Sequence, residues 1–253
     1  MAVLTEKQIK YGFDYYHKDD ARPKSVVEVS EYDGEDKLII NCTQLDEGYS
    51  AKDKKRIWLE WCDFLVNNPD AFTELMFCTR MPQDLFDAVC AQRRLKKLHI
   101  KWGVYPDISK LESLQELEYL HIGSGRSVSS LEPISRLVNL VALSIENFQQ
   151  IDDYAPLANL KHLESLALEG DFAAPKILKV QSLEFLRHMK QLRFFSLLTA
   201  KVIDKDYSPV LELNNLEHLT LKSCKEVKQL YPQLIKLPKL KYGTVLERPE
   251  LYE

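Results

Sequence analysis

The sequence predicts an α/β solenoid, a stack of similar coils in which each coil adds one strand to a parallel sheet. Three observations predict this fold. Apolar triplets with a fixed spacing recur along the chain, as in Leu140, Leu143 and Ile145. Successive triplets begin at nearly constant intervals, and most are followed by further apolar residues three positions apart. A coil of this kind cannot bury its apolar edge without neighbours above and below, so the coils should stack around one continuous core.

Residues 1–71 precede most of the repeats and are expected to form an N-terminal arm and a cap. The first 24 residues show no period and carry four aromatic side chains: Tyr11, Phe13, Tyr15 and Tyr16. We expect an irregular arm that packs against the fold, because a chain end without tying contacts frays. The alternative is an arm whose aromatic side chains clasp a partner.

The rest of this region predicts a cap made of a β-hairpin and a helix. Two β-rich runs, SVVEVS and KLIINCT, flank the turn residues Asp33 and Gly34, which is a pattern typical of a hairpin. Between residues 51 and 67 the apolar residues fall at intervals of three and four, as in an amphipathic helix. Since the end of a solenoid exposes an apolar cross-section, this hairpin and helix should cover it.

Residues 72–253 are expected to hold about eight repeats and a short C-terminal tail. The predicted strands begin at Phe72, Leu95, Leu117, Leu140, Leu163, Leu192, Leu216 and Leu240. The intervals between them are 22 to 24 residues, with one of 29. The long interval indicates an insertion at residues 171–180, either a binding loop or a tolerated surface insertion. Short helical turns are expected on the return segments, because four prolines lie near their starts: Pro133, Pro156, Pro209 and Pro232.

Residues 72–245 resemble the leucine-rich-repeat proteins, in the subclass with repeats of 22 to 24 residues seen in phosphatase regulators and internalins. The resemblance implies a horseshoe with a parallel sheet on its concave side. It is specific for the fold and weak for function. The asparagine ladder of the family is missing, and the equivalent positions are Gly103, Gly125, Phe148, Asp171, Ala200 and Cys224. Of these residues only Cys224 matches the family, which also uses cysteine in place of the asparagine.

The concave face is the predicted binding surface. Strand alternation sends the triplet residues into the core and the residues between them to the concave face. Small residues fill the middle of this face, and the aromatic side chains beside them are of the type enriched at binding hot spots. Glu146 and Glu169 form an acidic pair between lysines at the two ends. The predicted partner-binding residues are Lys97, His99, Lys101, Tyr119, His121, Glu146, Glu169, Phe194, His218, Lys222 and Tyr242.

Several classes of function are disfavoured. A net charge of −4 argues against binding to nucleic acid or to anionic membranes. The start of the chain lacks the pattern of a secretory signal and no apolar stretch is long enough to span a membrane, so we expect a cytoplasmic protein. Five scattered cysteines predict reduced core residues rather than disulfides. His99 and His121 lack a third ligand and no nucleophile has a recognisable base, so we expect no metal, no cofactor and no enzyme activity.

These patterns predict a protein, monomeric on its own, that binds another protein. One hypothesis is a bacterial inhibitor, such as an immunity protein that neutralises a cognate toxin. The alternative is a regulatory or targeting subunit of a cellular enzyme such as a phosphatase, as the resemblance would suggest.

Overall fold

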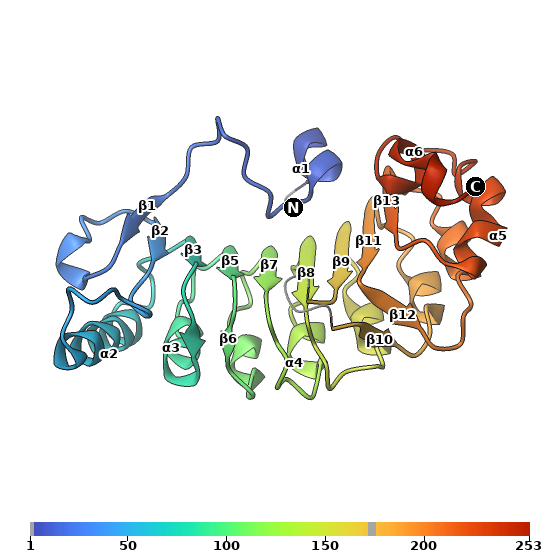
Figure 1. The fold of residues 1–253 in the computed structure, drawn as a ribbon. Helices are drawn as coiled ribbons and strands as arrows, with labels where there is room; N and C mark the ends of the chain where they lie inside the picture. Colours follow the sequence, from blue (N-terminus) through green and yellow to red (C-terminus); the bar gives the residue numbers. More distant parts are fainter. Residues whose placement is uncertain (1–2, 172–175) are drawn as a thin grey trace.

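A curved parallel sheet forms one wall of the computed structural model, which describes residues 3–171 and 176–253 (Figure 1). The strands lie in the order β1, β2, β3, β5, β7, β8, β9, β11 and β13. Their bounds are Lys24–Val26, Lys37–Ile40, Glu74–Phe77, Lys97–Ile100, Tyr119–Ile122, Ala142–Glu146, Ser165–Glu169, Phe194–Leu198 and His218–Leu221. Neighbouring strands pair in parallel, so each coil adds one strand in the same direction as the last.

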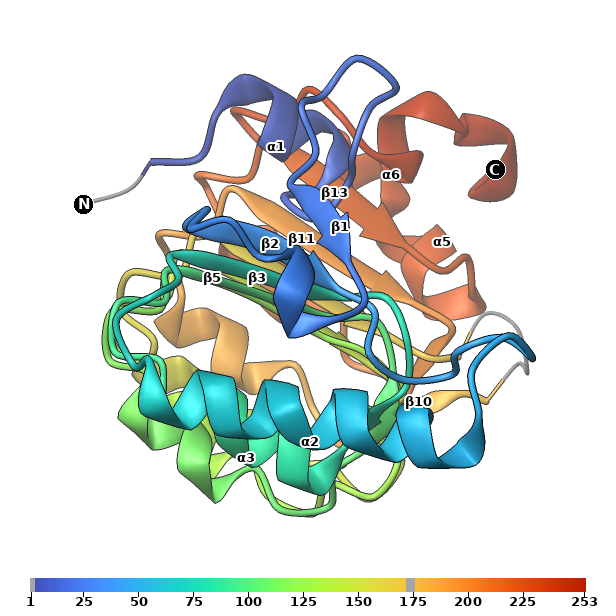
Figure 2. The same ribbon diagram turned by 90° about the vertical axis from the view of Figure 1, so that its left-hand side faces the viewer.

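Short helices form the opposite wall, on the convex side of the sheet (Figures 1 and 2). They are α3 (Gln83–Val89), η2 (Ser109–Ser113), α4 (Glu132–Ser135), η3 (Ala155–Asn159), η4 (Glu184–His188), η5 (Ser208–Glu212) and α5 (Lys225–Leu234). Prolines occupy the first turn of α4, η3 and η5, as the sequence predicts. Pro232 differs, because it lies inside α5, which ends two residues later.

The core lies between the two walls and follows the triplets. Leu98, Leu120, Leu143, Leu166 and Phe195 stand in register on neighbouring strands and are fully buried. One continuous apolar cluster extends from the first strand to the C-terminal residues. The predicted direction of the triplets is therefore confirmed.

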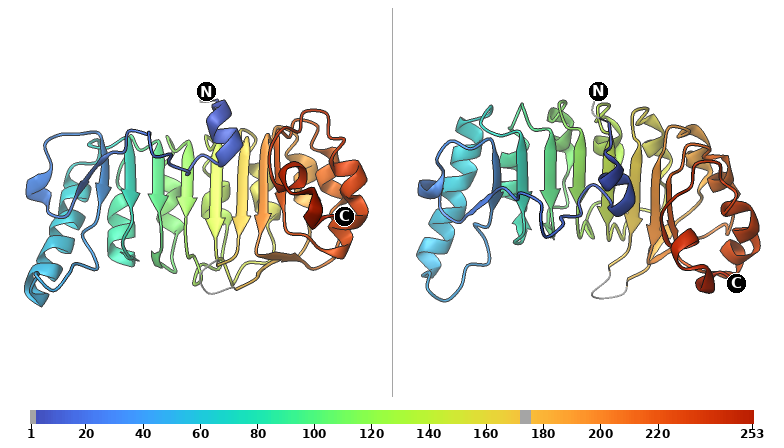
Figure 3. Two further views of the ribbon diagram at one scale, coloured as in Figure 1. Left: turned by 45° about the horizontal axis from the view of Figure 1, so that its top comes forward. Right: turned by 90° about the horizontal axis from the view of Figure 1, so that it is seen from above.

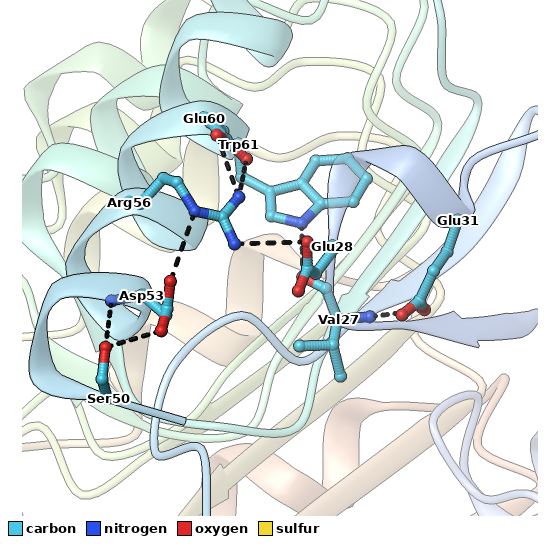
Figure 4. Close-up of polar contacts among 8 residues, drawn as sticks. All are labelled: Val27, Glu28, Glu31, Ser50, Asp53, Arg56, Glu60 and Trp61. Atoms are coloured by element: carbon cyan, nitrogen blue, oxygen red, sulfur yellow. Dashed lines mark hydrogen bonds and ion pairs between the residues drawn. The ribbon is translucent and has the colours of Figure 1, made fainter. Parts of the chain in front are cut away.

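The helix of the cap is α2, Ala51–Asn67, with the bounds that the sequence predicts. Ser50 caps its first turn by accepting a hydrogen bond from the backbone of Asp53. The buried Trp61 donates its indole N–H to the carbonyl of Val27 at 2.8 Å, and Arg56 pairs with Glu28 and with two carboxylates of α2 (Figure 4). These contacts attach the helix to the chain after β1.

The predicted β-hairpin is wrong. β1 and β2 pair in parallel, with Lys24 opposite Leu38, and the chain between them includes the 3-10 helix η1, Val29–Glu31. A tight turn joins antiparallel strands only, so the residues from 27 to 36 act as a return segment. The cap thus extends the parallel sheet of the solenoid by two strands.

The eighth predicted strand, at Leu240, does not form. Tyr242 makes a single parallel bridge with His218. Gly243 then adopts φ 99, which ends the extended run, and α6 (Thr244–Glu247) and η6 (Pro249–Leu251) follow. Tyr252 is buried and donates its hydroxyl to the carbonyl of Leu221 at 2.5 Å. The predicted tail is therefore a packed C-terminal cap.

The predicted insertion at residues 171–180 lies partly outside the described residues, which exclude 172–175. Asp171 forms an antiparallel bridge with Lys176. Beyond it, β10 (Leu178–Val180) pairs in parallel with β12 (Ala200–Val202), and β4 (Met81–Pro82) pairs with β6 (Gly103–Val104) in the same way. The described end of the insertion is thus a strand of a small second sheet.

Candidate functional site

The concave face carries three columns of side chains, as strand alternation predicts. The first column runs Glu74, Lys97, Tyr119, Ala142, Ser165, Phe194 and His218, each opposite the next in the strand register. The second runs Met76, His99, His121, Ser144, Ala167, Ser196 and Thr220 in the same register. In the third, Glu146 lies opposite Glu169 and Glu169 opposite Leu198.

An N-terminal arm, residues 3–16, lies across this face, and residues 17–23 join it to β1 (Figures 1 and 3). It begins with the helix α1, Glu6–Tyr11, which lies over the C-terminal half of the sheet, and then runs back toward β1. Thr5 and Gln8 form a reciprocal capping box that satisfies backbone donors at the start of this short helix. The expectation that the arm packs against the fold is confirmed, and the surface it covers is the predicted binding face.

Apolar contacts hold the centre of the arm. Leu4, Ile9 and Phe13 are 3%, 1% and 6% exposed and pack with Val141 and Ala142 of the sheet. Tyr119 and Tyr242 flank this cluster. The cluster is separate from the main core, so these sheet residues would face solvent if the arm were absent.

Polar contacts fix the extended part of the arm. The carboxylate of Asp14 lies 3.0 Å from Nδ1 of His121. The hydroxyl of Tyr16 donates to Glu74 at 3.0 Å and accepts from the Lys97 ammonium at 2.9 Å. This network places one partner from the sheet, His121, against Asp14, and two partners, Glu74 and Lys97, against Tyr16.

Further contacts hold the helical part. The hydroxyl of Tyr242 donates to Glu6 at 2.8 Å, and the ammonium of Lys10 lies 5.5 Å from the centre of the Tyr242 ring. Arg193 reaches the carbonyl of Leu4 at 3.5 Å while it is paired with Glu164 and Glu217. The arm is therefore held at both of its ends as well as at its centre.

The arm changes the predicted exposure of the face. Phe194 and His218, expected on an open surface, are only 6% and 8% exposed, and their rings stack at 4.2 Å. Tyr119 and Tyr242 are half-buried. The arm causes this burial, because its backbone at Ile9 and Lys10 lies against His218 and its Gly12 lies beside the Phe194 ring. The signal of the arm in the sequence is modest: apolar residues at positions 4, 9 and 13, of which only the last is directly followed by an acid, Asp14.

The arm contacts some predicted site residues and leaves others outside its footprint. It reaches Lys97, Tyr119, His121, Phe194, His218 and Tyr242. Lys101 and Lys222 are exposed at the two ends of the face, and Glu146 and Glu169 are half-buried between them. Burial raises the pKa of both glutamates, and nearby carboxylates raise it further. The predicted alternation of charge therefore remains along the third column.

His99 and His121 form a stacked pair on the concave face. The rings of His99 and His121 are 4.2 Å apart and nearly parallel. Burial and the neighbouring His121 lower the pKa of His99 to about 3, so it is neutral at physiological pH. Burial would raise the pKa of Asp14, but the hydrogen bond and charge of His121 lower it below its usual value. Within residues 3–171 and 176–253, no group of three or more His, Cys, Asp or Glu side chains could hold a metal ion.

A serine, a histidine and an aspartate do meet at His121, but their geometry is not that of a nucleophilic triad. The hydroxyl of Ser144 and the carboxylate of Asp14 both lie 3.0 Å from the same ring nitrogen, Nδ1. A triad needs the carboxylate on one nitrogen and the hydroxyl on the other. Ser144 is also only 4% exposed, so its hydroxyl is covered. The cluster links Asp14 of the arm to His121 and Ser144 of the sheet.

The cysteines are all free, but only Cys42 and Cys90 are buried, and the other three are half-buried. Burial raises the pKa of the Cys42 thiol to about 12 and that of Cys62 to about 11, so both are protonated thiols at neutral pH. Among the helices described, none is long and apolar enough to cross a membrane.

No protein-family model matches the chain, and no curated protein matches it. Among solved structures, an internalin from Listeria monocytogenes is similar over 81% of this chain and 51% of its own, with a TM-score of 0.53 and 18% identity. A leucine-rich-repeat protein from Leptospira interrogans is similar over 86% of this chain and 51% of its own, with a TM-score of 0.54 and 16% identity. The chain thus spans about half the length of each structure. The predicted fold is confirmed, and the chain is a leucine-rich-repeat solenoid.

Proposed function

We propose that this protein binds another protein through the concave face of its sheet, without catalysing a reaction. The observation that carries the proposal is the docked arm. The face buries a polypeptide segment that is part helix and part extended chain, with three apolar side chains at its centre. A face that can receive one such segment has the features that protein recognition uses: small side chains at its centre, aromatic side chains beside them and charged side chains at its ends.

We further propose that the partner is a toxin or another enzyme that is inhibited when its surface is covered. The third column supports selective recognition, because the exposed Lys101 and Lys222 stand at either end of the half-buried pair Glu146 and Glu169. Such an arrangement favours a partner with basic side chains at its centre and acidic ones at its edges. An inhibitor of this kind forms a tight complex of one copy with one copy.

Affinity capture from the native lysate tests the proposal, with the stoichiometry of the complex measured by light scattering. The test variant carries Glu146→Lys and Glu169→Lys. The matched control carries Glu132→Lys and Glu184→Lys, which make the same charge change at two exposed positions, in α4 and η4 on the convex side. We expect one stoichiometric partner that the control retains and the test variant loses. A partner that both variants retain equally would contradict binding at the concave face.

A further inference from the structure

The arm makes the contacts of a bound ligand rather than those of a core element. Its apolar side chains form a cluster apart from the main core, and that core is continuous without them. The segment that joins the arm to β1 arches away from the sheet (Figure 1). Several of its residues, including Lys18, Asp19 and Arg22, are exposed. The solenoid therefore does not need the arm to complete its core.

The contacts along the face occur in a fixed order. Near β8 the floor is apolar and formed by Val141 and Ala142, which receive the three buried arm side chains. Next, at β7, His121 meets a carboxylate 3.0 Å away. At β5 and β3, Lys97 and Glu74 meet a phenol hydroxyl. The face thus specifies a ligand sequence: aliphatic residues on a helical turn, an aromatic residue, a carboxylate directly after it, and a hydroxyl two residues further on.

We propose that the concave face is a receptor site for an amphipathic segment of the partner with this chemistry, and that the arm occupies the site until the partner segment displaces it. The inference rests on the proposed function, since it names what the partner presents to the same face. A tethered segment acts at an effective concentration of the order of millimolar, so the arm raises the concentration of partner needed for half-saturation. Binding is thereby restricted to partners that match the segment well.

The test uses the full-length protein and a defined probe. The released variant carries Ile9→Asp and Phe13→Ala, which place a charge and remove an aromatic ring at buried arm positions. The probe is a fluorescein-labelled synthetic peptide with the sequence of residues 3–16, followed by fluorescence anisotropy. We expect saturable binding to the released variant and at least tenfold weaker binding to the native protein, because the native arm holds the site.

Matched peptides test the ligand sequence. A peptide with Phe13→Ala should bind the released variant at least tenfold more weakly, because Phe13 is 6% exposed in the docked arm. A peptide with Tyr15→Ala should bind like the unchanged peptide, because Tyr15 is 57% exposed. Adding His121→Ala to the released variant should weaken its binding of the unchanged peptide. The same change should have little effect on the binding of a peptide that carries Asp14→Asn, because that peptide lacks the carboxylate.

Two results would overturn the proposal. The first is no peptide binding to a released variant whose circular dichroism and strand amide exchange match the native protein. The second is equal binding to the native and released proteins, which would place the peptide elsewhere.

The affinity of the captured partner for the released variant distinguishes this receptor proposal from the proposed function. We expect the partner to bind the released variant at least tenfold more tightly than the native protein, and the peptide to compete with it. A partner that is lost with the Glu146 and Glu169 variant but is not displaced by the peptide would refute the receptor proposal and leave the proposed function intact. Weaker partner binding after arm release would make the arm part of the binding surface and would also refute it.

Discussion

Replacing Phe13 with alanine should release the arm from the concave face and leave the solenoid folded. The Phe13 ring is 6% exposed, and its centre lies 5.9 Å from the centre of the Tyr119 ring. Burial of such a side chain contributes about 1.5–3 kcal/mol. The ring contacts a cluster outside the main core, so this loss falls on arm docking and spares the free energy of unfolding of the solenoid.

The loss is large enough to change the population of the docked state. A change of about 1.5–3 kcal/mol alters the ratio of docked to released arm by roughly 10- to 150-fold. Docking must also offset the ordering of the arm backbone, which costs about 1–2 kcal/mol per residue. Among the described residues of the arm, three apolar side chains are buried in this cluster, so removing one of them takes away a large part of the free energy of docking.

Hydrogen–deuterium exchange read by mass spectrometry measures the release. In the docked arm the amides of Ile9 and Gly12 donate to the carbonyls of Thr5 and Gln8 at 3.0 and 2.9 Å. These amides should exchange at least tenfold faster in Phe13→Ala, whereas the strand amides should keep their native rates. The control is Tyr15→Ala, at a side chain that is 57% exposed. Unchanged arm exchange in Phe13→Ala, or equal acceleration in the strands, would refute the reasoning.

Three further predictions concern the stability of the folded protein with its arm docked, each measured by urea unfolding. Burial lowers the pKa of His218 to about 4, so the unfolded chain binds more protons between pH 6.5 and 4. Stability should fall as pH is lowered through that window, by about 2 kcal/mol at pH 5, and equal losses in native protein and His218→Gln would contradict this. Gly243 has φ 99 and an added Cβ would lie 2.2 Å from a backbone oxygen, whereas Gly34 has φ 97 and no atom within 4 Å. Gly243→Ala should therefore cost at least about 2 kcal/mol more than Gly34→Ala, and equal costs would show that the close approach is absent. Trp61→Phe removes the hydrogen bond to the Val27 carbonyl and should cost about 1–3 kcal/mol, and an unchanged free energy of unfolding would mean that this bond contributes nothing.

The repeat array could be predicted from the sequence because its signals are local and repeated. Each triplet, such as Leu143 within its strand, fixes which side chains point inward, and parallel stacking then fixes the columns of the concave face. The helix from Ala51 to Asn67 could be predicted for a related reason, since its apolar period continues over 17 residues.

Two local signals were overridden by their surroundings. Asp33 and Gly34 have the residue types of a hairpin turn, but β1 gains its partner by continuing the parallel sheet. At the other end, Gly243 stands where the repeat pattern places a strand residue, and its positive φ turns the chain into α6. A triplet that contains glycine at a core position is a weaker predictor of a strand than one with three apolar side chains.

The position of the arm could not be predicted from a local pattern. Asp14 meets His121, and Glu6 meets Tyr242 far along the chain, so these contacts depend on complementarity that appears only once the sheet is folded. The first two predicted columns agree with the strand register from β3 to β13, but predicting that Phe194 is exposed was wrong because the arm covers it. The same complementarity makes the arm a guide to the ligand that this face would accept.

A nuclear Overhauser effect between the ring protons of Phe13 and Tyr119 in the native protein is the most direct test of the account. The ring centres are 5.9 Å apart, so cross-peaks between these two rings should be observed. We expect these cross-peaks in the native protein and their loss in Ile9→Asp. Sharp arm signals at random-coil shifts and no cross-peak between the rings would contradict the claim that the concave face of this solenoid receives a polypeptide segment.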